Sequence, residues 1–402
     1  MDALTTPLPK AWQRVRLGDI AEIIGGGTPS TQVASFWNGS INWFTPTEIG
    51  ITKYVHKSQR TITLLGLKKS SAKLLPIGTI LLTSRASIGD CAILKVVATT
   101  NQGFQSLIPL EKINNEFLYY LMLTLKNKLL KLASGSTFLE VSPDKIKNLS
   151  IPLPPLNEQI AIANILSDVD RYLYSLRALI LKKESVKKAL SFELLSQRKR
   201  LKGFSQNWQR VRLGTYKYRR GSFPQPYGNP QWYSDNGMPF VQVYDVGENF
   251  KLTQKTKQKI SKIAQPMSVF VPKNSVIITL QGTIGRVALT QYDCYCDRTI
   301  LIFDNNTLNG VNKYFFVLSL FTKFEEEKRK ADGSIIKTIT KQTLKDFEIL
   351  LPPLNEQIAI ANILSALDSE IISLKNKKRQ FDNIKKALNH DLMSAKIRVL
   401  KK

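Results

Sequence analysis

The sequence predicts an α+β fold made by tandem duplication: a mixed α/β domain followed by a long helix, and then the same two parts again. The main observation is an internal repeat, because the fifteen residues LPPLNEQIAIANILS occupy 153–167 and return unchanged at 351–365. A second repeat, WQRVRLG, occurs near the start of each domain, at 12–18 and at 208–214. Self-similarity at a fixed period is the signature of a repeated structural unit, so the two halves of the chain should fold in the same way.

The spacing of these repeats defines four expected parts. We place a first globular domain at 1–152, a central long helix at 153–203, a second globular domain at 204–350 and a C-terminal long helix at 351–402. A chain of 402 residues is long enough to build two domains, each with its own hydrophobic core.

Each globular domain is expected to combine short strands with one main helix. WQRVRLG alternates apolar and polar residues, which is typical of a half-buried strand. The apolar runs TILLTS and SVIITL are each followed by a glycine-containing turn, as expected of buried strands. Asn114 or Asn115 can cap a helix that ends near 134–135, and Asn312 can open the equivalent helix, which ends near 332–333.

The fifteen-residue repeat should begin a long helix. Pro154 and Pro155 end the preceding extended segment, Asn157 is the predicted N-cap, and Glu158 suits the positive end of the helix dipole. Neither glycine nor proline follows before about Lys199, which predicts roughly 65 Å of helix at about 1.5 Å per residue.

A helix of this length needs a partner along its side. Apolar residues recur at alternating steps of three and four, which is the pattern of a coiled-coil seam. The expected seam residues are Ile162, Ile165, Val169, Tyr172, Leu176, Leu179, Val186 and Leu190 in the first helix, and Ile360, Ile363, Leu367, Leu374, Phe381, Ile384 and Leu388 in the second. We expect the two helices to pair as an antiparallel coiled coil, which would place the globular halves at opposite ends of the pair.

The chain carries a net charge of +27, from 58 Lys and Arg against 31 Asp and Glu. This excess indicates a polyanionic partner, with nucleic acid as the first candidate and an acidic membrane surface as the second. The membrane is the weaker candidate, because we find no basic amphipathic helix with an apolar face rich in Trp and Phe. The three cysteines, Cys91, Cys294 and Cys296, form no disulfide framework and are expected to be buried thiols in a cytoplasmic protein.

The two halves are not equally similar along their length. The helix starts are identical, whereas the segments after WQRVRLG have diverged, as in two related domains whose loops bind different targets. A recent duplication combined with helix-capping needs would instead predict uniform similarity. The identical helix starts would present one surface twice, to two copies of the same partner. The predicted docking residues are Asn157, Glu158, Gln159, Asn355, Glu356 and Gln357.

The residues favour a binding protein over an enzyme. The sequence has no GxxxxGK[ST] phosphate loop, and GNPQWY at 228–233 departs at Gln231 from the NPPY-like motif of adenine methyltransferases. Two histidines without a nearby nucleophile argue against an acid–base site. Two other classes stay open at this point: a stand-alone, pseudo-dimeric DNA-binding regulator, and a nucleic-acid enzyme whose site these motifs do not reveal.

The motifs IPLPPLNEQIAIANIL and LLPPLNEQIAIANIL resemble the heads of the two conserved helices in the specificity (HsdS-type) subunits of type I restriction–modification systems. The segments GGGTPS, SRASIG and TNQGF of the first half, and VQVYDV, TLQGTIG and CDRTILIF of the second, are also similar to that family. The resemblance covers essentially the whole chain, and the doubled PPLNEQ motif is highly specific.

This resemblance implies a DNA-recognition subunit without a catalytic site. Two target-recognition domains would each read half of a split double-stranded DNA site, and the paired helices would set the spacer between the half-sites. Two adenine methyltransferase subunits would dock on the helices, and motor–nuclease subunits would join for restriction. S-adenosylmethionine, ATP and Mg²⁺ would then belong to the partner subunits, and neither a cofactor nor a metal is expected in this chain.

Candidate DNA contacts lie in loops that follow the expected strands. Arginine in such a loop suits guanine and glutamine suits adenine in the major groove. GGGTPS could bring backbone amides to a phosphate, or it could be an ordinary flexible turn. Arg219 and Arg220 fall where the first half has Ile23 and Ile24, and they could contact DNA or form a solvated charge pair. The candidates are Gly26, Gly27, Thr28, Ser30, Ser84, Arg85, Asn101, Gln102, Arg219, Arg220, Tyr227, Gln242, Tyr244, Gln281, Arg286 and Arg298.

Overall fold

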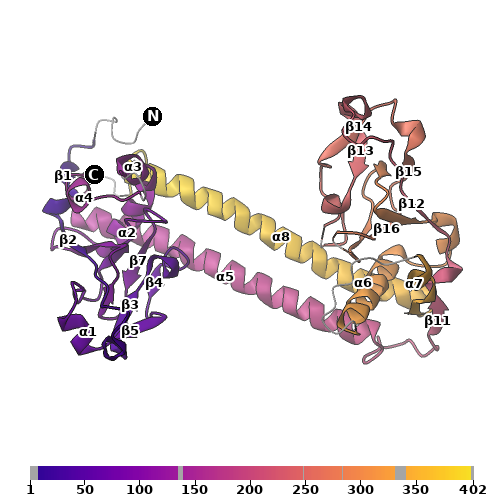
Figure 1. The fold of residues 1–402 in the computed structure, drawn as a ribbon, viewed down its shortest axis with the longest axis horizontal. Helices are drawn as coiled ribbons and strands as arrows, with labels where there is room; N and C mark the ends of the chain where they lie inside the picture. The colour runs from indigo at the N-terminus through magenta and orange to yellow at the C-terminus, as the bar shows by residue number, and fades with distance from the viewer. Residues whose placement is uncertain (1–7, 135–138, 248, 283, 331–340, 400–402) are drawn as a thin grey trace. The chain divides into compact units, whose positions relative to one another are not determined.

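A computed structural model describes residues 8–134, 139–247, 249–282, 284–330 and 341–399. Its contacts divide the chain into two compact units, which we call unit 1 (Met1–Arg177 with Asn376–Lys402) and unit 2 (Ala178–Lys375). Each unit contains one globular half together with part of each long helix (Figure 1).

Unit 1 contains a five-stranded sheet with the order β2-β9-β6-β7-β4, a three-stranded sheet with the order β5-β3-β8, and the pair β1-β10. The strands are β1 (Gln13–Arg16), β2 (Ala21–Gly25), β3 (Trp37–Phe44), β4 (Tyr54–Val55), β5 (Arg60–Ile62), β6 (Ile80–Leu82), β7 (Cys91–Leu94), β8 (Ala98–Thr100), β9 (Gln105–Pro109) and β10 (Ser150–Leu153). The short helices are α1 (Leu64–Lys68), α2 (Asn115–Thr124), α3 (Lys126–Leu132) and α4 (Pro143–Lys147).

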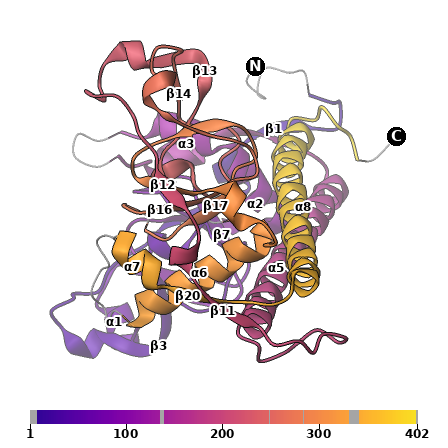
Figure 2. The same ribbon diagram turned by 90° about the vertical axis from the view of Figure 1, so that its right-hand side faces the viewer.

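Unit 2 repeats this plan, with the sheet orders β12-β19-β16-β17 and β14-β13-β18-β15 and the pair β11-β20. Helix α6 packs against β17 (Figure 2). The strands are β11 (Gln209–Arg212), β12 (Tyr218–Arg220), β13 (Tyr233–Val241), β14 (Gln258–Ile260), β15 (Val269–Val271), β16 (Val276–Thr279), β17 (Val287–Leu289), β18 (Cys294–Cys296), β19 (Ile300–Phe303) and β20 (Glu348–Leu351). The helices are α6 (Lys313–Lys330) and α7 (Lys341–Asp346).

The matching strand orders confirm the predicted duplication. Strands β2, β9, β6 and β7 correspond to β12, β19, β16 and β17, and β5, β3 and β8 correspond to β14, β13 and β18. The ladders also correct one alignment. Because Ser106 pairs with Ile24 and its counterpart Ile302 pairs with Arg219, Arg219 is equivalent to Ile24 and Arg220 to Gly25. The sequence comparison was therefore wrong by one residue here, since the two halves differ in length just before this strand.

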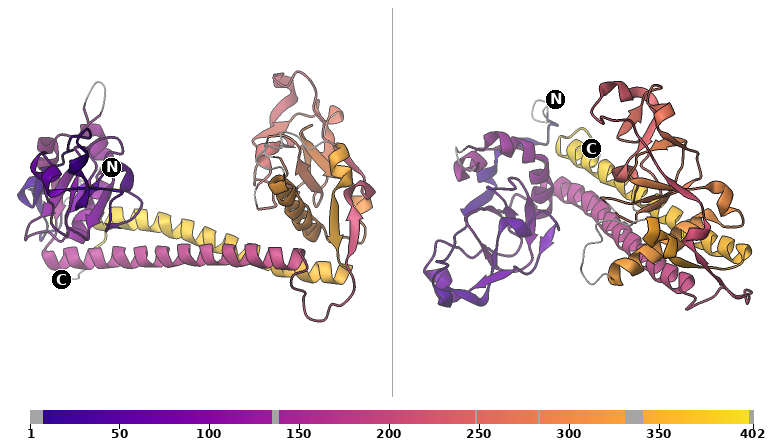
Figure 3. Two further views of the ribbon diagram at one scale, coloured as in Figure 1. Left: turned by 60° about the horizontal axis from the view of Figure 1, so that its bottom comes forward. Right: turned by 45° about the vertical axis from the view of Figure 1, so that its right-hand side comes forward.

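The long helices are α5 (Leu156–Leu195) and α8 (Leu354–Met393), and in each unit their segments lie side by side (Figure 3). In unit 1, Asp170 forms an ion pair with Lys385, while Glu158, closer to the start of α5, pairs with Arg398. In unit 2, Lys183 pairs with Glu370 at 2.9 Å, and Arg200, just beyond the end of α5, pairs with Glu356 at 2.6 Å. Partner numbers fall along α8 as they rise along α5, so the helices are antiparallel, as predicted.

The predicted seam is wrong in part. Leu179, Val186, Ile363 and Ile384 are exposed, and so is Tyr172, although its ring centre lies 4.7 Å from that of Phe381. The buried side chains of the two helices include Leu166, Leu173, Leu176, Ile180, Leu364 and Ile371. Both sets repeat at steps of three and four, so periodicity alone could not decide which stripe faces the partner helix.

The helix ends test the predicted caps. Asn114 and Asn312 each accept a hydrogen bond at 2.9 Å from the amide three residues later, which confirms both caps. Asn157 is not the N-cap, because α5 already begins at Leu156 and the amides of Glu158 and Gln159 donate to the Pro155 carbonyl. The first helix is interrupted at residue 125, between α2 and α3, and the predicted helix end near 332–333 lies outside the described residues.

Each globular half shares its hydrophobic core with both long helices. In unit 1 the core joins Phe117 of α2 to Ile162 of α5 and Leu392 of α8. In unit 2 the equivalent core joins Phe315 of α6 to Leu194 of α5 and Ile360 of α8. Cys91, Cys294 and Cys296 are free, buried thiols, as predicted, and burial raises the pKa of Cys91 to about 12.

Helix α8 contains one stretch with a mean hydropathy of 1.3, which by length and composition alone could cross a membrane. This is weak evidence for a span, because the core helix of a water-soluble protein passes the same test. The apolar side chains Ile360, Leu364 and Ile371 of this helix are buried within unit 2.

Candidate nucleic-acid interface

In unit 1 the ends of four strands meet. The Gly27 amide, after β2, donates to the Thr100 carbonyl at 2.9 Å, and the Asn101 amide, after β8, donates to the Phe44 carbonyl of β3 at 3.1 Å. The Ser84 amide, after β6, donates to the Gly103 carbonyl at 2.8 Å. We call the loops that these bonds hold together, residues 26–30, 45–48, 84–89 and 101–103, the first strand-end cluster.

Unit 2 builds the same arrangement from the equivalent strands. The Gly221 amide, after β12, donates to the Ile300 carbonyl at 2.9 Å, and the Asp297 amide, after β18, donates to the Val241 carbonyl at 3.0 Å. The Leu280 amide, after β16, donates to Thr299 at 2.9 Å. The second strand-end cluster comprises residues 221–228, 242–245, 280–282 and 297–299. Most predicted contact residues therefore gather at one place in each unit.

Two glycines of the first cluster are required by backbone packing. A Cβ on Gly26 would overlap the Asn101 carbonyl, and a Cβ on Gly27 would overlap the backbone at Ala72. The Gly27 amide already donates to a carbonyl. The phosphate-cradle prediction is therefore wrong for Gly27, whose amide is occupied, and both glycines are explained by the close approach of another backbone segment.

The polar residues around these glycines contact one another. The Thr28 hydroxyl donates to Oε1 of Gln102, and the Asn101 side chain accepts from the Gly103 amide at 2.9 Å. Gln102 is exposed. Ser30 is also exposed, and its carbonyl accepts the Trp37 indole N–H at 3.0 Å.

Two residues of the first cluster that were predicted to contact DNA, Ser84 and Arg85, are less available to a ligand. Ser84 is buried, so its hydroxyl cannot reach a ligand at the surface, and that prediction is corrected. Arg85 forms an ion pair with Glu140 at 2.8 Å, which satisfies part of its guanidinium inside unit 1.

The second cluster is richer in aromatic and charged groups. The Tyr227 hydroxyl donates to the buried Asp297 carboxylate, and the Arg298 guanidinium lies 5.2 Å from the centre of the Tyr227 ring. Burial, with the Asp297 carboxylate beside the hydroxyl, raises the pKa of Tyr227 well above its usual range. The Tyr244 hydroxyl donates to the Gln242 side chain, and Gln281 is exposed on the neighbouring loop.

The other arginines of this half differ in their partners. Arg219 donates to the Phe270 carbonyl at 3.1 Å, and Arg286 donates to the Val246 carbonyl at 3.2 Å. Both are therefore at least partly used within unit 2. Arg220, at the end of β12, is exposed and precedes Gly221, whose backbone packs against the Asp297 carbonyl.

Sequence reasoning missed a basic segment in each half. Residues 49–89 contain seven Lys and Arg without any Asp or Glu, and residues 251–292 contain the same number, also without an acid. The side chains of Lys255, Lys257 and Lys262 are exposed, and the Lys257 ammonium lies 4.8 Å from the Tyr244 ring centre. A count of acids along the chain would have found these segments, because the total charge hides how unevenly the acids are distributed.

The predicted docking residues divide into buried and exposed positions. Glu158, Gln159, Glu356 and Gln357 are buried. The Gln159 carboxamide accepts the Asn114 amide at 2.8 Å, and Gln357 does the same for Asn312 at 2.9 Å. The docking prediction is corrected for these four side chains, which join the helix starts to the globular halves.

The two buried glutamates hold equivalent networks. Glu158 accepts the Trp12 indole N–H at 3.0 Å and two N–H groups of Arg398, at 2.8 and 3.1 Å. Glu356 accepts the Trp208 indole N–H at 3.1 Å and two N–H groups of Arg200, at 3.2 and 2.6 Å. Each network therefore ties a domain start, a helix start and the segment after the other helix together.

Four positions of the fifteen-residue repeat are exposed in both copies, and they lie along one helix face. Leu156 and Ile160 are 46% and 42% exposed, and Leu354 and Ile358 are 44% and 41% exposed. The other exposed pairs are Asn157 with Asn355, and Asn164 with Asn362. Positions four apart are neighbours on a helix surface, so the repeat offers the same partly apolar face twice. We call these eight residues the repeated face.

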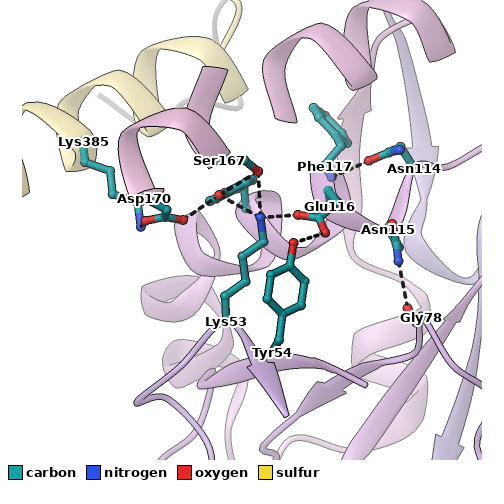
Figure 4. Close-up of polar contacts among 11 residues, drawn as sticks. Lys53, Tyr54, Gly78, Asn114, Asn115, Glu116, Phe117, Ser167, Asp170 and Lys385 are labelled. Atoms are coloured by element: carbon teal, nitrogen blue, oxygen red, sulfur yellow. Dashed lines mark hydrogen bonds and ion pairs between the residues drawn. The ribbon is translucent and has the colours of Figure 1, made fainter. Parts of the chain in front are cut away.

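A polar junction joins the first globular half to the helices of unit 1 (Figure 4). Lys53 pairs with Glu116 of α2 and donates to Tyr120 at 2.9 Å and to Ser167 of α5 at 2.8 Å. Tyr120 in turn donates to Asp170, which pairs with Lys385 of α8. Burial lowers the pKa of Lys53, and the Glu116 carboxylate opposes that shift.

Unit 2 makes the same junction largely from aromatic rings. The carbonyls of Lys53 and Phe250 accept equivalent strand amides, so Phe250 takes the place of Lys53. Phe250 packs against Tyr314 and Phe321, with ring centres 6.4 and 5.2 Å apart. The two halves thus keep the same backbone while the chemistry of the junction has changed.

Replacing Lys53 with alanine is expected to lower the free energy of unfolding of unit 1 by about 3 kcal/mol, because Glu116 would be left without its buried cation. Lys251→Ala, which removes an exposed lysine at the equivalent edge of unit 2, should change stability by less than about 0.5 kcal/mol. Chemical denaturation combined with hydrogen exchange in α2 measures both effects, and equal stability of the two variants would contradict the junction.

The sequence of this chain matches a family model and known proteins. The model of the type I restriction modification DNA specificity domain matches residues 9–183 and 223–381. The MjaIX type I restriction enzyme specificity subunit of Methanocaldococcus jannaschii is 28% identical over 98% of this chain and 95% of that protein. The EcoR124I/EcoR124II specificity subunit of Escherichia coli is 37% identical over 38% of this chain and 40% of that protein.

Solved structures share the fold. The S subunit of a type I restriction–modification system from M. genitalium superimposes with a TM-score of 0.61 at 16% identity, covering 96% of this chain and 98% of that one. A chain from a structural study of complex assembly and conformational transition in the type I system gives a TM-score of 0.62 at 19% identity, covering 96% and 99%.

Proposed function

This chain belongs to the type I restriction modification DNA specificity family, and we propose that it is the non-catalytic subunit that selects the DNA sequence on which the other subunits of such a complex act. Each globular half reads one half of a bipartite double-stranded site. The paired helices α5 and α8 set the spacing of the half-sites and carry the partner subunits.

One observation carries this proposal: the same strand-end cluster occurs twice on equivalent backbones but carries different side chains. Gln102 stands where the second half has Arg298, and Thr28 and Tyr227 are their respective neighbours. Specificity lies in side chains that reach base edges, whereas the framework only places them. Two equivalent backbones that carry different side chains are what two half-sites of different sequence require.

The distribution of charge supports DNA as the ligand. Each acid-free basic segment contains one loop of a strand-end cluster, 84–89 within 49–89 and 280–282 within 251–292. Neutralising DNA phosphates with Lys and Arg supplies most of the sequence-independent affinity. A stand-alone regulator would also bind DNA, but it gives no reason for an identical, exposed helix face in both units.

The repeated face supports two copies of one partner, which we propose to be adenine methyltransferase subunits. The buried positions of the fifteen-residue repeat are explained by equivalent contacts within units 1 and 2. Leu156, Ile160, Leu354 and Ile358 are not explained in this way, because they are exposed and yet identical. Exposed apolar residues that match between two copies indicate a surface that is recognised twice.

The reaction chemistry then belongs to the partners. We propose that the methyltransferase subunits use S-adenosylmethionine and flip one adenine of each half-site out of the duplex, since an adenine inside the stack cannot be reached. Motor–nuclease subunits would use ATP and Mg²⁺ for restriction. A chain with free, buried thiols that acts on the host chromosome is proposed to work in the cytoplasm.

Replacing Lys255, Lys257 and Lys262 together with glutamine is expected to weaken DNA binding by a similar factor on all sequences. Each lost phosphate contact should reduce the slope of log affinity against log salt by about 0.9. A titration of the complex with labelled duplex between about 50 and 200 mM salt measures this slope.

The matched control replaces three exposed lysines of the long helices, Lys182, Lys188 and Lys386, with glutamine. This variant removes the same charge but leaves both strand-end clusters unchanged, so its salt slope should stay near that of the parent. Equal slopes for the two triple variants would show that charge alone, and not the basic segment of unit 2, attracts the DNA.

A further inference from the structure

The two strand-end clusters can be aligned residue by residue. The loops compared are those that carry Gln102 and Arg298. On the N-terminal side of each loop, Trp43 pairs with Thr99 in unit 1 as Phe240 pairs with Tyr295 in unit 2. On the other side, the Ser84 amide donates to the Gly103 carbonyl as the Leu280 amide donates to the Thr299 carbonyl, which makes Gly103 equivalent to Thr299. The connecting loops have equal lengths, so Gln102 and Arg298 occupy the same place on the same backbone.

Arg298 is held in position while its donors stay free. Its guanidinium lies over the Tyr227 ring, and the Tyr227 hydroxyl is tied to Asp297. Asp297 is buried and also accepts the Thr299 amide at 2.8 Å and the Thr299 hydroxyl at 2.6 Å. In the described part of the chain the guanidinium has no hydrogen-bond acceptor, so a rigid cation with five N–H donors faces solvent.

Gln102 is held in a corresponding manner. The Thr28 hydroxyl donates to its carboxamide oxygen, and the side chain is exposed. A carboxamide oxygen has two lone pairs, so one acceptor site and both N–H donors stay available. Adenine presents the complementary pair in the major groove, with an acceptor at N7 and a donor at N6.

Three of the other four candidate arginines differ from Arg298, because part of each guanidinium is used within its own unit. Arg85 is paired with Glu140, Arg219 donates to a carbonyl, and Arg286 donates to another. A guanidinium must keep at least two parallel donors free to bind O6 and N7 of guanine. Arg298 meets this condition and is also supported by a ring and a buried carboxylate behind it.

We propose that Gln102 and Arg298 read equivalent base pairs of the two half-sites, with Gln102 recognising an adenine and Arg298 a guanine. This inference rests on the proposed function, and it adds which side chains set the specificity and which base each selects. Thr28 positions Gln102, and Tyr227 with Asp297 positions Arg298. The two half-sites then differ at this position because the two loops differ by one side chain.

The test uses the complete methyltransferase complex and sequencing of modified bases on genomic DNA. Arg298→Gln is expected to reduce methylation of the parental site by about 10- to 100-fold, the value of one bidentate base contact, and to change one base of one half-site. Gln102→Arg should change the equivalently placed base of the other half-site from adenine to guanine. Tyr227→Phe, which keeps the ring but frees Asp297, should keep the same motif with weaker discrimination at that base.

Two matched controls accompany these variants. Arg198→Gln removes another exposed guanidinium that lies over an aromatic ring, 4.7 Å from the centre of Phe192, outside both clusters. Gln13→Arg adds an arginine at an exposed position of β1. Both controls should methylate the parental motif at the parental rate.

A motif that is unchanged base for base in Arg298→Gln and Gln102→Arg would overturn the inference while leaving the proposed function intact. A parental chain that directs no bipartite motif would overturn the proposed function itself. If a variant stops methylating, its binding to duplexes that vary one base pair at a time decides the case. Lost preference at one position supports the inference, whereas equal weakening on all duplexes marks a phosphate contact and overturns it.

Discussion

Replacing Ile160 and Ile358 together with aspartate is expected to abolish assembly of this chain with its methyltransferase partners. Both side chains are exposed on the repeated face, so the chain itself should fold with unchanged stability. An apolar anchor at the centre of an interface is worth about 2 kcal/mol or more, and a buried, unpaired carboxylate adds to that loss. Affinity at each docking site should fall by at least about 30-fold. Analytical ultracentrifugation of the mixed subunits measures the number of partners bound.

The single variants sharpen this prediction. Ile160→Asp alone should leave one partner bound, and so should Ile358→Asp alone, because the two copies of the face are equivalent. Ile384→Asp is the matched control, since Ile384 lies on α8 outside the repeat and is 52% exposed. Full assembly of the double variant would show that the partner docks elsewhere and that the repeated face has another use.

Replacing Glu158 and Glu356 together with alanine is expected to destabilise both units, by about 2 to 4 kcal/mol each. Each glutamate is at most 3% exposed and accepts bonds from an indole and an arginine. Its removal leaves those donors unpaired, and breaking a buried ion pair from one side is costly. Because Arg200 and Arg398 are partly exposed, the loss should lie in the lower part of the range for such pairs.

The matched variants are Glu158→Gln and Glu356→Gln, which keep an acceptor for the Trp12 and Trp208 indoles but remove the charge. They should lose roughly half as much stability as the alanine variants. Chemical denaturation gives the total change, and hydrogen exchange at residues 391–399 reports whether the segment after α8 is released. Alanine variants as stable as the parent would contradict the structural role assigned to the two glutamates.

Much of the fold was predictable because the evidence for it is local or repeated. The duplication is visible as identical letters, and the caps at Asn114 and Asn312 depend on residues only three positions apart. The antiparallel pairing of α5 and α8 followed from two long apolar helices within a duplicated chain. The buried cysteines followed from their small number and their position in apolar strands.

The errors at Glu158, at Gly26 and Gly27, and at Ser84 share a different cause, which is contact between residues distant in sequence. Glu158 resembled a surface residue at a helix start, yet its partners Trp12 and Arg398 lie 146 and 240 positions away. Gly26 and Gly27 resembled a phosphate loop because the backbone segments packed against them cannot be recognised from the sequence. Ser84 is buried by the same convergence of strands that brings the other candidates together.

The candidate site was predictable as a set of loops but not as a set of contacts. The sequence placed most candidates after strands, and the structure gathers them into one cluster per unit. It could not distinguish Arg298, which keeps its donors free, from Arg85, which pairs with Glu140 from a segment beyond α3. That distinction depends on which acidic residues the fold brings near each arginine.

The most direct test of the central claim is to sequence the modified bases of a host genome with and without this chain, keeping the methyltransferase subunit present in both. The account predicts a methylated adenine in each half of a bipartite motif, and it predicts that both marks disappear when the chain is deleted. Methylation that persists unchanged without the chain, or that falls on a single uninterrupted motif, would contradict the claim that its two halves select a split DNA site.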